Sequence, residues 1–93
     1  MKYDIVITNS CKKDIKKASK QGKNLDLLFE VVDQLSEGKT LDSKYKDHKL
    51  SGEYKGMREC HIEPDWLLIY KYVDDKLVLV LFATGSHSEL FNK

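Results

Sequence analysis

Several common features are missing from this chain of 93 residues, and each absence excludes a class of protein. Its two cysteines, Cys11 and Cys60, form no paired motif, which argues against a disulfide-stabilised fold. No apolar run approaches the length that spans a bilayer, and no charged-then-apolar leader opens the chain. We therefore expect a cytoplasmic protein that makes no membrane contact, with both cysteines as buried free thiols.

The common nucleotide-binding and catalytic motifs are also absent. The chain contains no P-loop, no G-x-G-x-x-G, no G-x-S-x-G and no C-x-x-C. Its histidines lie 13 and 26 residues apart, which matches no helix-borne metal motif. Three histidines and an aspartate are nevertheless enough ligands for zinc, so a metal site remains the alternative. We expect no metal and no cofactor.

What the chain does contain is an ordinary globular composition with unevenly placed charge. Apolar residues make up 41% and charged residues 33%, which predicts one folded domain over residues 1–93. The net charge is only +1, but residues 1–23 carry seven lysines against two acidic residues. Residues 44–58 carry five basic residues against two acidic ones. Two such segments could form a basic face for phosphates, and the alternative is a solvated lysine-rich helix.

The first half of the chain predicts one strand and two helices. Residues 3–8 are short and β-branched, which favours a strand. Asn9 or Ser10 can cap a helix with apolar residues at helical spacing, namely Cys11, Ile15 and Ala18. Asn24 can cap a second helix, whose apolar positions are Leu25, Leu28, Val31, Val32 and Leu35, and Gly38 ends it.

The second half predicts three strands after a loop. Residues 39–53 are charged and without period, so we expect a loop that holds His48. The expected strands are 54–63, 66–72 and 77–82, and a capping box of Ser86 and Glu89 predicts a short C-terminal helical turn. The predicted fold is an α+β domain of order β-α-α-β-β-β, with two helices covering one face of a mainly antiparallel four-stranded sheet.

The histidines occupy polar stretches next to predicted turns. Imidazole exchanges protons near neutral pH, so three such residues favour acid–base chemistry. If the last three strands form a meander, the topology brings four residues to one end of the sheet: His61, Asp65, Trp66 and His87. His48 is not placed by this argument. The alternative for any single histidine is an ordinary surface or capping residue.

Two aromatic residues flank these polar stretches. Trp66 and Phe91 could stack on nucleobases, each contributing about 1–3 kcal/mol. The alternative for both side chains is packing in the core. A polar, stackable substrate therefore fits the combination of histidines and aromatic rings.

Three runs together resemble the YafQ-like branch of the RelE/ParE toxin superfamily. They are Y-K-D-H-x-L-x-G over residues 45–52, R-E-C-H-I-E-P-D-W-L-L-I-Y over 58–70 and G-S-H-S-E-L-F over 85–91. The resemblance implies a metal-independent endoribonuclease that cleaves mRNA in the ribosomal A site. It also implies a cognate antitoxin as partner, in a toxin–antitoxin hetero-oligomer.

The resemblance also implies roles for individual residues. His87 would donate a proton to the leaving 5′ oxygen, while His48, His61 and Asp65 would be candidates for the base and for stabilising the scissile phosphate. Trp66 and Phe91 would hold the RNA near the catalytic groups.

One position departs from the family pattern. Family members often carry a phosphate-contacting arginine two residues before Gly85, where this chain has Ala83. Arg58, Lys49 or Lys55 could supply the missing cation. The departure keeps two alternatives open: a ParE-like gyrase-directed toxin, and a weakly active or inactive module of the same fold that binds an antitoxin.

Overall fold

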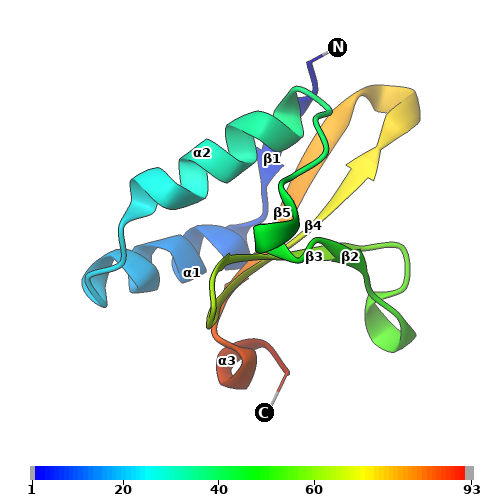
Figure 1. The fold of residues 1–93 in the computed structure, drawn as a ribbon. Coiled ribbons are helices and arrows are strands. Elements are labelled where there is room, and N and C mark those ends of the chain that lie inside the picture. The colour runs from blue at the N-terminus through cyan, green and yellow to red at the C-terminus, as the bar shows by residue number, and fades with distance from the viewer. Residues whose placement is uncertain (1, 92–93) are drawn as a thin grey trace.

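A computed structural model describes residues 2–91 of the chain. The elements follow the order β1 (Asp4–Ile7), α1 (Asn9–Lys20), α2 (Leu25–Ser36), β2 (His48–Lys49), β3 (Arg58–Glu63), β4 (Trp66–Val73), β5 (Val78–Gly85) and α3 (His87–Phe91). Short 3-10 turns occupy Ser43–Tyr45, Gly52–Tyr54 and Asp74–Lys76. The α+β class is confirmed, with α1 and α2 on one side of the sheet and α3 near the C-terminal end (Figure 1).

Local sequence signals set the helix ends. Thr8, rather than Asn9 or Ser10, caps α1, because its Oγ1 accepts a hydrogen bond from the Cys11 backbone N–H at 3.0 Å. Asn24 caps α2 as predicted, accepting from the Asp26 N–H at 3.0 Å. Gly38 follows α2 with φ +76°, the left-handed conformation that a helix C-terminus favours.

The sheet has five strands where four were expected. Its order is β1-β5-β4-β3-β2, with β1 parallel to β5 and the other pairs antiparallel. The additional strand, β2, pairs His48 with Glu59 and Lys49 with Arg58. The prediction of a loop missed it because two charged or polar residues are too short to show an alternating pattern. The strand predicted from residue 54 begins only at Arg58, since residues 52–54 form a 3-10 turn.

The main core lies between the helices and one face of the sheet, which we call the covered face. It contains Cys11, Leu28, Val31, Leu35, Cys60, Leu68, Tyr70, Leu79 and Leu81, among others. Both cysteines are free and buried, as expected, and burial raises the pKa of each thiol to about 12. Such thiols remain protonated at neutral pH and are poor nucleophiles.

A smaller apolar cluster lies on the opposite, open face of the sheet. Leu67, Ile69 and Leu90 form its buried part, and Leu50, Tyr54, Met57, Phe82 and Ala83 pack around them. Residue 90 belongs to α3, so this cluster attaches the C-terminal helix to the sheet. Among residues 2–91, no helix is long and apolar enough to cross a membrane.

Candidate active site

The histidines are organised by cross-strand registers on the open face. His48 on β2 lies opposite Glu59 on β3, which lies opposite Ile69 on β4, which lies opposite Ala83 on β5. Residues directly opposite in a sheet share a face, so these four form one row. His61 lies opposite Leu67 and begins the next row on the same face, because side chains two residues apart along a strand point the same way.

Glu59 is the centre of this arrangement, although it is only 4% exposed. Its Oε1 lies 3.5 Å from His48 Nε2 and 3.6 Å from His61 Nε2. The Nδ1 atoms of the same rings contact backbone carbonyls, at 2.7 Å from Lys46 O and 3.3 Å from Pro64 O. Because a carbonyl only accepts, Nδ1 carries the proton in each contact, and Nε2 is the nitrogen that faces the carboxylate. Each ring therefore lies between a backbone carbonyl at Nδ1 and the Glu59 carboxylate at Nε2.

His87 is the third histidine of the cluster and lies next to His61. Its ring centroid lies 5.6 Å from that of His61. Asp65 Oδ1 contacts both the His87 backbone N–H, at 3.2 Å, and Nδ1, at 3.4 Å. The capping box sets the start of α3, since the Ser86 N–H donates to Glu89 Oε1 and the Glu89 N–H to Ser86 Oγ. The His87 side chain is 56% exposed, against 16% for His61, so His87 is the more accessible to a substrate.

The same groups form a candidate cation site. Ligand atoms of Glu59, His61 and His87 lie within 4.8 Å of one another. Two imidazoles and a carboxylate are a donor set that suits zinc or copper. The arrangement can therefore serve proton transfer or hold a metal ion, and a bound ion would occupy the lone pairs that proton transfer needs.

The two predicted stacking residues differ in accessibility. Phe91 is 42% exposed, and its ring centroid lies 6.3 Å from that of His87. Trp66 is 1% exposed and packs in the covered-face core, with Lys23 Nζ 5.8 Å from the ring centroid. Its ring offers no surface to a nucleobase in this structure. The alternative of core packing describes Trp66, whereas Phe91 remains a stacking candidate.

The cations expected to replace the family arginine lie away from the histidines. Arg58 Nε and Nη2 each lie 3.3 Å from an Asp47 oxygen, and Tyr70 OH donates to Asp47 Oδ1 at 2.7 Å. Lys49 is opposite Arg58 in the register, so both occupy the face opposite His48 and Glu59. These two residues and Lys55 line a separate cavity of about 720 Å³ at the β2 edge of the sheet.

Sequence reasoning missed two acidic residues in this region. Glu59 precedes His61 by two residues in a strand, and that spacing alone places both side chains on one face. Asp47 adjoins His48 in the sequence, but its contacts with Arg58 and Tyr70 depend on β2, which was not predicted. The position of Glu59 beside His61 could have been predicted from the sequence pattern, whereas the contacts of Asp47 could not.

The fold and this histidine cluster define a RelE/ParE-like toxin, and sequence comparison agrees. A family described as the bacterial toxin of type II toxin-antitoxin system, YafQ, matches residues 3–92. The chain belongs to this YafQ toxin family. It is 40% identical over 89 residues to the mRNA interferase toxin YafQ of Escherichia coli (strain K12), covering 95% of each chain.

Solved structures give the same relationship. A metal-bound toxin from Helicobacter pylori is 44% identical, with a TM-score of 0.91 and coverage of 96% of this chain and 99% of that one. The E. coli DinJ–YafQ toxin–antitoxin complex contains a chain that is 39% identical, with a TM-score of 0.88 and coverage of 98% and 99%.

Proposed function

We propose that this chain is the toxin of a type II toxin–antitoxin pair and an endoribonuclease that cleaves mRNA on the ribosome. The observation that carries the proposal is the meeting of three imidazoles around Glu59 and Asp65, beside the exposed ring of Phe91. Family membership and the E. coli relative, an mRNA interferase toxin, support the same reaction. The substrate is a polar RNA strand with a stackable base and a labile phosphodiester.

In the proposed reaction the RNA supplies its own nucleophile. A base removes the proton of a 2′-hydroxyl, its oxygen forms a bond to the adjacent phosphorus, and the bond from phosphorus to the 5′ oxygen breaks. An acid protonates that leaving oxygen, so the products are a 2′,3′-cyclic phosphate and a 5′-hydroxyl. Each general acid or base typically contributes about 10²–10⁴-fold to the rate.

The geometry favours particular residues for the two proton transfers. His87 serves as the acid, because it is exposed and Asp65 contacts its Nδ1, which leaves Nε2 to face the substrate. Asp65 is thereby occupied in positioning His87. The base is then His48 or His61, which accepts the 2′-hydroxyl proton at Nε2, because Nδ1 of each ring donates to a backbone carbonyl and Glu59 faces both Nε2 atoms.

A metal ion has no step in this mechanism, and we expect it to inhibit. A cation bound by Glu59, His61 and His87 would hold the imidazole lone pairs that accept protons. Cleavage should survive a strong chelator under conditions that keep ribosomal magnesium, and one equivalent of Cu²⁺ should suppress it. Loss of cleavage on chelation, restored by stoichiometric zinc, would overturn the mechanism in favour of metal catalysis.

We also propose a cognate antitoxin as the protein partner. The E. coli relative has been solved in a complex with the antitoxin DinJ. A small open reading frame next to the gene, encoding a DNA-binding domain with a disordered tail, would support this partner, and coexpression of its product with this chain should yield a stable hetero-oligomer and relieve growth arrest.

Toeprinting on translating ribosomes tests the function directly. The proposal expects new mRNA 5′ ends at A-site codons, which appear only when ribosomes are present. Cleaved DNA held by gyrase, with intact mRNA, would identify a gyrase-directed toxin instead. Antitoxin binding with neither cleaved mRNA nor cleaved DNA would identify an inactive binding module. Ala83, in place of the family arginine, is the reason to test this alternative.

A further inference from the structure

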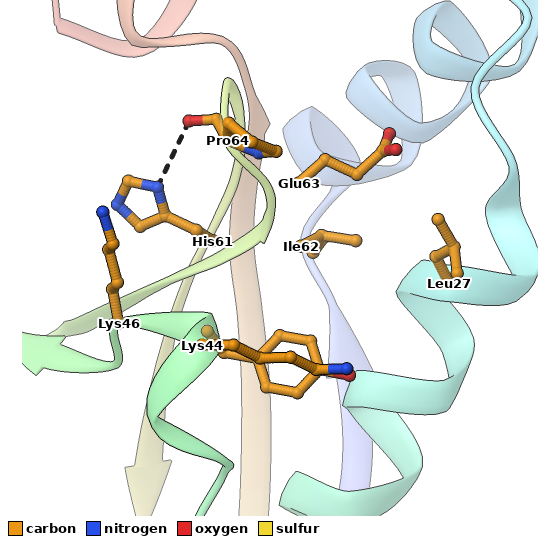
Figure 2. A pocket seen from close by; sticks show the side chains of 8 residues that line it. Leu27, Lys44, Lys46, His61, Ile62, Glu63 and Pro64 are labelled. Atoms are coloured by element: carbon orange, nitrogen blue, oxygen red, sulfur yellow. Dashed lines mark hydrogen bonds between the residues drawn. The ribbon is translucent and has the colours of Figure 1, made fainter.

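A cavity of about 350 Å³ opens beside His61, between α2, the 3-10 turn at Ser43–Tyr45 and the turn joining β3 to β4 (Figure 2). Leu27, Tyr45, Ile62 and Pro64 give it apolar walls. Lys44, Lys46 and the single acid Glu63 supply its charged groups. The volume falls within the range of about 300–1,000 Å³ that is usual for small-ligand pockets.

Lys46 connects this cavity to the histidine cluster. Its backbone has φ +49°, a left-handed conformation that non-glycine residues seldom adopt. In this conformation its carbonyl accepts the His48 Nδ1 hydrogen bond at 2.7 Å, while its side chain points toward the His61 ring (Figure 2). One residue therefore orients a histidine and directs an ammonium group to the mouth of the cavity.

The cavity walls also combine charge with an aromatic ring. Lys44 Nζ lies 5.1 Å from the centroid of the half-buried Tyr45 ring. Two ammonium groups near apolar and aromatic walls complement a ligand that is flat on one part and anionic on another. A nucleotide has this chemistry, since its base is planar and its phosphate is negatively charged.

We propose that this cavity is the subsite for a nucleotide that flanks the scissile phosphate, and that Lys46 is the cation that contacts this phosphate. The inference rests on the proposed endoribonuclease function. The base lies against Leu27, Tyr45 and Ile62, and the phosphate lies between Lys46 and His61. Lys46 thus supplies the cation that Ala83 lacks. Arg58 does not supply it, because its guanidinium is paired with Asp47.

Binding of a mononucleotide tests the subsite without ribosomes. We expect adenosine 3′-phosphate to shift the backbone amide resonances of Leu27, Tyr45 and Ile62 in NMR titrations. Inorganic phosphate should shift only Lys46 and His61. Leu27→Trp, which fills the cavity from α2, should abolish the nucleotide-specific shifts, and Tyr45→Ala should weaken them if the tryptophan variant does not fold. Shifts that map elsewhere, or none at millimolar nucleotide, would overturn the proposal.

Cleavage on ribosomes separates this inference from the function itself. Lys46→Met should lower the single-turnover rate by about 10–100-fold, the usual effect of losing a hydrogen bond to a charged group. Lys76→Met, the same change at an exposed lysine in the turn between β4 and β5, should cut at the wild-type rate. Phe29→Trp is the matched control for Leu27→Trp, because Phe29 is exposed on the same helix and does not line the cavity.

The outcomes are distinguishable. If the wild type fails to cleave, the proposed function is wrong whatever the variants do. If the wild type cleaves and both Lys46→Met and Leu27→Trp cleave equally fast, only the subsite is wrong. If Leu27→Trp weakens antitoxin binding while cleavage is unchanged, the cavity receives an antitoxin segment and the assignment to RNA fails.

Discussion

The two faces of the sheet show how neighbouring residues in one strand acquire opposite roles. Cys60 points to the covered face, where it is fully buried, and burial raises the pKa of its thiol to about 12. Glu59, the preceding residue, points to the open face and contacts His48 and His61. Both side chains are buried, but Glu59 lies within ion-pair distance of two histidines, whereas burial and the charges of Asp47 and Glu59 all raise the pKa of the Cys60 thiol. We therefore expect the covered face to provide mainly stability and the open face to provide the proposed proton transfers.

The contrast predicts that the largest change in activity follows from a residue on the open face with little packing. We expect His87→Ala to reduce cleavage by about 10²–10⁴-fold, because it removes the proposed general acid. The melting temperature should change little, since the side chain is mostly exposed. Single-turnover cleavage and thermal unfolding of the same preparation check both parts, and wild-type cleavage by this variant would exclude His87 as the acid.

The covered face should show the reverse behaviour. Leu68→Ala is expected to lower the free energy of unfolding by about 2–5 kcal/mol, because it leaves a cavity in the main core. Cleavage per folded molecule should persist at low temperature. Urea unfolding gives the stability change, and a large loss of rate in fully folded protein would contradict the division between the faces.

Adding a cation to the open face should sharpen the comparison. Ala83 lies in the row of His48, Glu59 and Ile69, so Ala83→Arg directs a guanidinium toward the histidines. A hydrogen bond to a charged group contributes about 1.5–3 kcal/mol, which sets a ceiling on the order of a hundredfold gain in rate.

Ala83→Met adds length without charge and is the control. The gain should be greatest in the Lys46→Met background, because both cations would contact the same phosphate. A gain of equal size in both backgrounds would show that the two positions act independently.

A smaller effect is expected from changing Glu59, whose carboxylate faces the His48 and His61 rings. Glu59→Gln keeps the shape of the side chain but removes the charge that faces His48 and His61, and we expect about a tenfold loss of rate with a changed pH–rate profile. Glu30→Gln, the same change at an exposed glutamate of α2 that does not line the cavity, should have a normal profile. Identical profiles for the two variants would remove Glu59 from the positioning role.

The smallest effect concerns the attachment of α3. Hydrogen bonding to Lys17, at 2.7 Å, and to the Ser86 N–H lowers the pKa of Glu89 from 4.5 to about 2. A depressed carboxyl pKa contributes stability above pH 4.5, and this contribution is lost as the pH falls toward 2. Across this pH window, the free energy of unfolding of Glu89→Gln should vary less with pH than that of the wild type. The difference should be about 1 kcal/mol or less, since the Lys17–Glu89 pair is partly solvated. An unchanged pH dependence would contradict this assignment.

Much of the architecture follows from local patterns. The apolar spacing in α2, the Asn24 cap, Gly38 and the Ser86–Glu89 capping box each act within one turn of chain, so the sequence alone is sufficient to predict them. The meander also placed His61, Asp65 and His87 at one end of the sheet. Strand β2 was missed, because two residues form a strand only when β3 is present to pair with them.

The sequence by itself determined the α+β class, the order of the main elements and the residue types available for acid–base chemistry, because these depend on local periodicity and turn chemistry. The tertiary structure alone decided which side chains of different strands and helices meet on one face. It buried Trp66, paired Arg58 with Asp47 and placed Glu59 between two histidines. These outcomes depend on strand register and on contacts between residues far apart in the chain, which no local pattern encodes.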